Sequence, residues 1–274
     1  MTTTPALPPA LAHLGLHAWP FPKAPAVASL FRFPALDELI ARVSFAVDLC
    51  GLALVTGDPG SGKSTALRLF ISTLTERSHP VIYLADSHLT PSEFYARILD
   101  HFGVTPGFTY SQRRRQFQSL LGDLNQSQDK TAIVIIDEAH ELMADMVQEL
   151  RYVQNLHMDA QSAFALLLCG HSEIRSQLRL KAFEAVAQRI TVRAHLPGLD
   201  RAQTVAYIRH ALAGAGVERA VFTDAALDVL HDQSHGLIRR IGTIAGHALL
   251  DAGLGQQELV EEANVRRAVA EADD

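Results

Sequence analysis

An eight-residue stretch, GDPGSGKS, has the residue types and spacing of a loop that binds a phosphate chain. Its glycines let the backbone curl without Cβ clashes, so that several N–H groups can point inward. An apolar run precedes the stretch and a helical pattern follows, and the positive end of a helix dipole attracts an anion. Lys63 can reach the outer phosphates, and the Ser64 hydroxyl can ligate Mg²⁺. The predicted cradle for ATP and Mg²⁺ comprises Gly57, Asp58, Pro59, Gly60, Ser61, Gly62, Lys63, Ser64 and Thr65.

A second candidate element is the acidic pair Asp137-Glu138, which follows the apolar run 133–136. Such a run is typical of a central parallel strand, and residues just beyond its carboxyl end fall at the ligand-binding edge of an open α/β sheet. Asp137 is suited to hold the metal through its water shell, and Glu138 to orient the water that attacks the terminal phosphate. The order of the two elements predicts ATP hydrolysis; loop acids without a catalytic part are the alternative.

Two histidines lie near these elements. His171 follows the apolar run 163–169, which predicts the next central strand, so it can contact the terminal phosphate or the attacking water. A surface histidine is the alternative. His140 comes shortly after the acidic pair and could act as a switch or a relay, although a lone histidine there is more often structural or solvent-facing.

Two arginines have positions that suit nucleotide sensing. Arg189 stands before the last predicted strand, near the edge of the domain, where a guanidinium can reach a neighbour's nucleotide in trans. Arg239 follows a glycine hinge at a predicted helix start and can fold back onto the bound nucleotide. Structural salt bridges are the alternative for both. The competitors for the role in trans are Arg175, Arg179 and Arg193.

Three consecutive arginines, Arg113, Arg114 and Arg115, open another predicted helix. Positive charge in a first turn opposes the helix dipole unless an anion lies nearby. The run is therefore either a solvated charged face or a contact with the phosphate backbone of DNA.

Bulk properties narrow the class of protein. The chain has 274 residues, 48% hydrophobic residues and a formal net charge of −6, which gives no global signal for nucleic acid but leaves a local basic surface open. Its two cysteines predict buried thiols rather than a disulfide framework. The N-terminus is a poor signal peptide and no apolar stretch reaches membrane-spanning length, so we expect a cytoplasmic protein without a membrane partner.

The apolar periodicity predicts an α/β domain with a parallel sheet flanked by helices, followed by a small helical lid. The expected domains are an N-terminal arm at 1–25, a nucleotide-binding domain at 26–197 and the lid at 198–274. In the first domain, 172–190 is expected to be helical, and after Pro197-Gly198 the pattern is helical throughout. The lid helices are predicted at 200–214, 224–235, 237–252 and roughly 257–271.

The order of these motifs resembles that of an AAA+ P-loop ATPase. The stretches GLALVTGDPGSGKSTALR, AIVIIDEAHEL and LLLCGHSEIRSQL more narrowly resemble the ExeA/TniB/TnsC group. Relatives often have Gln where this chain has His171, and in the initiator-like clade the region corresponding to 103–115 can approach DNA. The resemblance implies that Lys63 and Ser64 are Walker A, Asp137 and Glu138 Walker B, His171 sensor 1, Arg189 the finger and Arg239 sensor 2.

The same resemblance implies two functions. The favoured one is an ATP-dependent transposition regulator, a ring or filament that oligomerises on duplex DNA without base specificity and links a target-selection protein to a transposase. The alternative is an ExeA-like ATPase for secretin assembly in type II secretion. That protein type is longer and has a membrane span and a peptidoglycan-binding region, neither of which is recognised here. A nucleotide-gated scaffold with negligible turnover is the third possibility.

Overall fold

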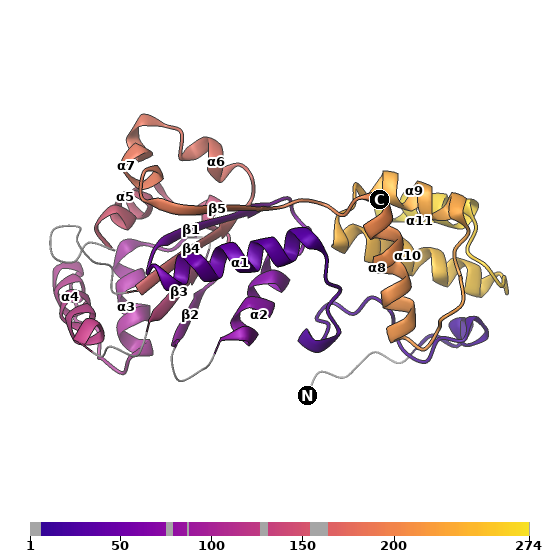
Figure 1. The fold of residues 1–274 in the computed structure, drawn as a ribbon, viewed down its shortest axis with the longest axis horizontal. Helices are drawn as coiled ribbons and strands as arrows, with labels where there is room; N and C mark the ends of the chain where they lie inside the picture. Colours follow the sequence, from indigo (N-terminus) through magenta and orange to yellow (C-terminus); the bar gives the residue numbers. More distant parts are fainter. Residues whose placement is uncertain (1–6, 75–78, 87, 127–130, 154–163, 274) are drawn as a thin grey trace. The chain divides into compact units, whose positions relative to one another are not determined.

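A five-stranded parallel sheet forms the centre of one of two compact units in this computed structural model (Figure 1). The structure describes residues 7–273 except 75–78, 87, 127–130 and 154–163. The strand order is β2-β3-β4-β1-β5. The strands are β1 (Leu52–Gly57), β2 (Val81–Leu84), β3 (Ala132–Ile136), β4 (Phe164–Gly170) and β5 (Ile190–Leu196).

The register of the central strands sets the position of the chemistry. Strands β1, β3 and β4 are buried along their whole length, as their continuous apolar runs predict, whereas β5 at the edge alternates between buried and exposed residues. Thr56 pairs with Gly170, and Ile136 pairs with Leu168. The carboxyl ends of these three strands therefore lie at one edge of the sheet, and each leads into a predicted site element.

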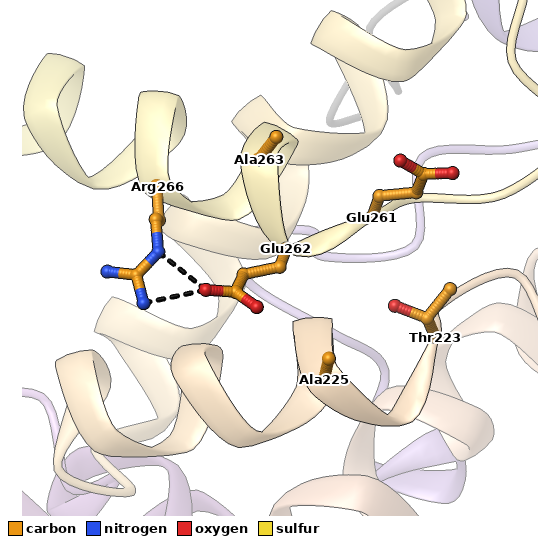
Figure 2. Close-up of a pocket in the computed structure, with 6 residues that line it drawn as sticks. All are labelled: Thr223, Ala225, Glu261, Glu262, Ala263 and Arg266. Atoms are coloured by element: carbon orange, nitrogen blue, oxygen red, sulfur yellow. Dashed lines mark hydrogen bonds and ion pairs between the residues drawn. The ribbon is translucent and has the colours of Figure 1, made fainter.

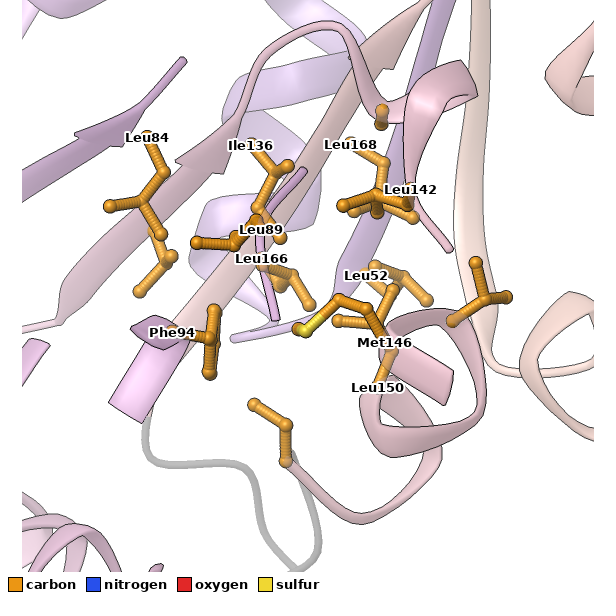
Figure 3. Close-up of a cluster of buried hydrophobic side chains, with 14 of the residues drawn as sticks. Leu52, Leu84, Leu89, Phe94, Ile136, Leu142, Met146, Leu150, Leu166 and Leu168 are labelled. Atoms are coloured by element: carbon orange, nitrogen blue, oxygen red, sulfur yellow. The ribbon is translucent and has the colours of Figure 1, made fainter. Parts of the chain in front are cut away.

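Helices of this unit cover the sheet. Its longer helices are α1 (Pro34–Asp48, whose first residue groups with the other unit), α2 (Lys63–Thr73), α3 (Pro91–His101), α4 (Tyr110–Gln126) and α5 (Ala144–Val153). One face of the sheet packs with α3, α4 and α5 in a hydrophobic cluster, part of which is shown in Figure 3. There Met146 and Leu150 of α5 lie against strand residues such as Leu166. Burial of each such side chain contributes about 1.5–3 kcal/mol, so this layer holds β3 and β4 firmly beside each other.

The helix predicted over 172–190 is wrong in its continuity. The segment consists of the short pieces α6 (Ile174–Gln177), η4 (Lys181–Phe183) and α7 (Glu184–Ala187). Between the first two, Leu180 has extended backbone and an exposed side chain. Apolar residues at 174, 178, 183 and 186 do not keep one helical period, and the break lets Phe183 and Val186 both reach the core.

The other unit comprises the N-terminal residues to Pro34, the loop Asp58–Gly62 and Pro197–Asp274. Thr223 caps α9 by accepting the backbone N–H of Ala226, and Asp200 forms a capping box with Gln203 at the start of α8. No described helix is long and apolar enough to cross a bilayer. The helices of this unit are η1 (Pro9–Leu14), η2 (Val27–Ser29), α8 (Arg201–Gly214), α9 (Asp224–Ser234), α10 (Ile238–Leu254) and α11 (Glu262–Asp273), the last beginning later than predicted.

The N-terminal arm packs along α10 within this unit. A Cβ on Gly246 would lie 2.7 Å from the Trp19 ring, and a Cβ on Gly253 would lie 2.6 Å from the Ala10 carbonyl oxygen. The side chain of Leu11 is fully buried. Because these two positions of α10 have no side chain, the arm can approach the helix closely.

Candidate functional site

The phosphate-cradle sequence forms a loop between β1 and α2. The loop needs glycine at two positions, because Gly60 and Gly62 have φ angles of +83° and +100°. Lys63 begins α2 and is only 6% exposed, and its ammonium group donates a hydrogen bond to the Gly57 carbonyl oxygen at 3.0 Å. A buried cation at the start of a helix, just after glycines with positive φ, is the chemistry that a polyphosphate requires.

Residues Asp58–Gly62 of this loop group with the helical unit, where they meet the first turn of α10. The backbone N–H of Arg239 donates to the Gly60 carbonyl oxygen at 3.1 Å. A Cβ on Gly60 would lie 3.0 Å from the Arg239 Cβ, so the two backbones are in close contact. The structure thus brings the predicted sensor arginine to the loop.

The loop and the acidic pair come together through side-chain oxygens. The Ser64 hydroxyl donates to Asp137 Oδ2 at 3.1 Å, and the Tyr83 hydroxyl donates to the same oxygen. Asp137 is 4% exposed, and the pKa of Tyr83 is raised by burial and by its hydrogen bond to this carboxylate. Mg²⁺ is bound by one or two carboxylates, waters and substrate phosphates, so a serine hydroxyl and a carboxylate at this distance fit a magnesium site.

Glu138 stands in a strained position directly after Asp137. Its φ is +52°, in the left-handed region, and its backbone N–H donates to Asp137 Oδ1 at 2.9 Å. Non-glycine residues held there often mark functional sites. Glu138 Oε2 lies 3.5 Å from His140 Nδ1 and 3.7 Å from His171 Nε2.

The two histidines form a stacked pair, with ring centroids 3.9 Å apart and planes at 28°. The backbone fixes this pair: a Cβ on Gly170 would lie 3.0 Å from the His140 backbone nitrogen, so glycine lets the two segments approach. Gln177 Nε2 also donates to the His140 carbonyl oxygen at 3.1 Å. The pKa of His171 is lowered by burial, and further by His140 and Lys63, which favours a neutral imidazole at this site.

Sequence reasoning placed His171 beside the site, interpreted His140 as more often structural or solvent-facing, and did not identify Tyr83. A histidine three residues after Asp137 carries no signal by itself. Its approach to His171 depends on the sharp turn at Glu138, which the sequence does not reveal. Tyr83 lies on β2 opposite Ile135 of β3, so only knowledge of the strand order could have placed it near Asp137.

The candidates for an arginine acting in trans lie around the short helices before β5. Arg189 is half-buried and its backbone N–H donates to the Val186 carbonyl oxygen. Arg193 donates to the Ala187 carbonyl oxygen at 2.6 Å, whereas Arg175 and Arg179 are exposed. Action in trans stays a prediction for Arg189.

The three arginines of α4 have partners within the chain. The helix begins at Tyr110, so the predicted start at Arg113 is wrong. Arg113 donates to the Gly107 carbonyl oxygen at 2.7 Å, and Arg115 donates to the Ser111 carbonyl oxygen at 3.2 Å. Arg114 lies 3.4 Å from Glu149, a largely buried carboxylate. Arg114 therefore has an anionic partner within the chain, whereas Arg113 and Arg115 donate to neutral carbonyl oxygens, and the DNA contact stays a prediction.

An open pocket in the helical unit lies away from these motifs in the sequence. Arg266 and Glu262 form an ion pair across part of it, as Figure 2 shows, with a second carboxylate from Glu261 nearby. It contains no glycine loop and its one guanidinium is neutralised, so it is a poor phosphate site. Its lining residues are Thr223, Ala225, Glu261, Glu262, Ala263 and Arg266.

A family model described as an AAA domain matches residues 47–178. This match covers just under half of the chain. The match begins before β1 and ends after α6, so it includes the glycine loop, the acidic pair and His171. The AAA+ P-loop fold predicted from the sequence is confirmed by two solved structures. Cdc6p from Pyrobaculum aerophilum has a TM-score of 0.70 at 14% identity, covering 92% of this chain and 70% of that one. DNA-bound Drosophila ORC has a TM-score of 0.65 at 17% identity, covering 100% and 70%.

A curated relative, General secretion pathway protein A of Aeromonas hydrophila, is 31% identical over 241 residues, which is 87% of this chain. The chain spans 44% of the length of that relative. This match supports the ExeA-like alternative better than the transposition regulator that the sequence favoured. The solved structures carry no argument about DNA for this chain, because at 14–17% identity they show the fold alone.

Replacing Arg114 with Ala should lower the free energy of unfolding by about 1 kcal/mol or more, because Glu149 loses its cationic partner in a buried setting. Arg115→Ala, at an exposed position on the same helix, is the matched control and should change stability by less than about 0.5 kcal/mol. Urea unfolding followed by circular dichroism measures both values. Equal effects would contradict the structural role of Arg114.

Proposed function

We propose that the chain binds ATP with Mg²⁺ and hydrolyses it to ADP and phosphate. The observation that carries the proposal is the hydrogen bond between Ser64 and Asp137, which brings the end of the glycine loop to the acidic pair across 73 positions of sequence. An ATPase needs these two groups at one metal. The site also needs a cation for the phosphate oxygens and a group that orients the attacking water, and we assign these roles to the Lys63 ammonium and the Glu138 carboxylate.

Each side chain has a role that follows from its place. Lys63, now paired with a carbonyl oxygen, exchanges that partner for the β- and γ-phosphate oxygens. Ser64 and Asp137 hold Mg²⁺, which would neutralise charge that develops on the phosphates. Glu138, half-exposed and next to Asp137, orients the attacking water, and the neutral His171 ring contacts that water or the terminal phosphate. Arg239, whose backbone N–H donates to the Gly60 carbonyl oxygen of the loop, is the candidate sensor of the nucleotide.

We infer that this ATPase serves assembly in a secretion pathway, as an ExeA-like module. The support is the 31% identity to General secretion pathway protein A over most of this chain. The ATPase would then work as one part of an assembly, with nucleotide binding joining copies of the chain and hydrolysis loosening them. Arg189 of one copy would stabilise the terminal phosphate held by its neighbour.

Lys63→Ala should abolish nucleotide binding, because it removes the buried cation of the loop. Glu138→Gln should leave binding within about threefold while lowering turnover about 10²- to 10⁴-fold, the usual contribution of a positioned base. Binding of a fluorescent ATP analogue and steady-state phosphate release measure the two properties. Loss of binding in Glu138→Gln would contradict the role of the glutamate, and a wild-type chain that binds ATP without turnover would favour the scaffold hypothesis.

Mixing two inactive variants tests whether the arginine acts in trans. The Lys63→Ala variant cannot bind nucleotide but keeps Arg189. The Arg189→Ala variant keeps its nucleotide pocket but lacks the arginine that would act on a neighbour. Together they should recover a substantial part of wild-type turnover, because some interfaces join an intact pocket to an intact arginine. Lys181→Ala, which removes an exposed positive charge in the same segment, is the control and should be active alone. Absence of recovery, with both variants oligomeric by light scattering, would exclude Arg189 as the finger.

Duplex DNA distinguishes the secretion role from transposition. Under the secretion proposal, duplex DNA at low salt should change turnover by less than twofold and should not drive polymer formation. Phosphate release and sedimentation with a slowly hydrolysed ATP analogue measure these effects. DNA-dependent polymers whose affinity falls steeply with salt would instead support the transposition regulator.

A further inference from the structure

We propose that Glu138, His140 and His171 form a binding site for one zinc ion beside the magnesium site, and that zinc bound there blocks hydrolysis. The binding step is independent of nucleotide. The effect on hydrolysis rests on the proposed ATPase function.

The donor atoms are already close to the required separation. Glu138 Oε2, His140 Nδ1 and His171 Nε2 all lie within 4.8 Å of one another, and the carboxylate oxygen is 3.5 Å and 3.7 Å from the two nitrogens. Zinc bonds of about 2.0–2.2 Å in a tetrahedron place donors about 3.3–3.5 Å apart. The lone pair of each ring nitrogen lies in its ring plane, so the two rings would rotate out of their stack for both nitrogens to point at one ion.

An unsatisfied oxygen is the independent sign of a ligand. Glu138 Oε2 is buried and has no hydrogen-bond partner, although the rest of its side chain is about half exposed. A buried carboxylate oxygen without a hydrogen-bond partner is costly, and here the two ring nitrogens that it faces lie 3.5 Å and 3.7 Å away. A cation between the three atoms satisfies it.

The donor set favours zinc over magnesium. Two imidazole nitrogens and one carboxylate are the ligands of many catalytic zinc sites, which keep a fourth position for water. Magnesium prefers oxygen ligands in octahedral geometry, so it would stay with Ser64 and Asp137. The backbone around the three ligands is fixed by Gly170 and by the hydrogen bond from Gln177 to the His140 carbonyl oxygen, which lowers the cost of ordering the site.

The consequence for hydrolysis follows from shared residues. A zinc ion on Glu138 and His171 occupies the groups that orient the attacking water. Lys63, Ser64 and Asp137 are not ligands of this ion, so nucleotide binding should persist while turnover falls.

Zinc binding is measured on the full chain without nucleotide, and with any affinity tag removed, by competition of ZnCl₂ against a chromophoric chelator. We expect one tight zinc ion per chain, with affinity lowered at least tenfold in His140→Ala and in His171→Ala. The matched control is His101→Ala, because His101 is an exposed histidine at the end of α3 in the same unit. It should leave the affinity unchanged.

Thermal melts followed by circular dichroism establish that each variant is folded, and His140→Gln provides a second variant that keeps a polar side chain. Equal zinc affinity in wild type, His140→Ala and His140→Gln would overturn the site, as would the absence of any tight zinc ion. In turnover assays with saturating Mg-ATP, zinc should lower the wild-type rate reversibly, and His140→Ala should need at least tenfold more zinc for the same fractional loss. If wild type has no turnover but the histidine variants still lose zinc, the ATPase proposal fails and the metal site stands.

Discussion

The hydrogen bond between Ser64 and Asp137 depends on the position of β4 between β3 and β1. Neither residue is near the other in sequence, and β3 does not pair directly with β1. The register of β4 with both neighbours aligns the carboxyl ends of the three strands, so the loop after β1 and the acidic pair after β3 face one edge. The wholly apolar strands are therefore the structural condition for the polar site, since a shift in their register would separate its two halves.

The positions of Glu138, His140 and His171 depend on a strained turn and on a close contact between two backbone segments. The left-handed backbone of Glu138 turns the chain sharply after Asp137, and this turn returns His140 to the end of β4. Gly170 accepts the returning backbone where a larger residue would collide with it. Backbone strain of about 1–3 kcal/mol at Glu138 is tolerated because the packed strands on either side fix both ends of the turn. The turn therefore brings the Glu138 carboxylate and the two histidine rings together in one cluster.

The sequence predicted the parts of the site that are local motifs and missed those that depend on tertiary contacts. Lys63 and Ser64 belong to a loop whose spacing carries its own chemistry, and the strand before Asp137 is evident from its continuous apolar run. His140 and Tyr83 have no such signal, because their partners come from other strands. The segment 172–190 shows the same limit: local periodicity favoured one helix, but the positions of the core required a break at Leu180. For the α4 arginines the sequence left a solvated face and a contact with an external anion as alternatives, because the pairing of Arg114 with Glu149 depends on tertiary structure.

Gly60 illustrates how one loop position meets two independent requirements. Its φ of +83° excludes most side chains on backbone grounds alone. A Cβ at this position would lie 3.0 Å from the Arg239 Cβ, so the first turn of α10 would have to give by a few tenths of an ångström, and the Gly60 carbonyl oxygen accepts the backbone N–H of Arg239 in that turn. A side chain at position 60 would therefore meet both an unfavourable φ and a tight contact. The arm residues Trp19 and Ala10 pack on the same helix, so within this unit α10 contacts both the loop and the N-terminal arm.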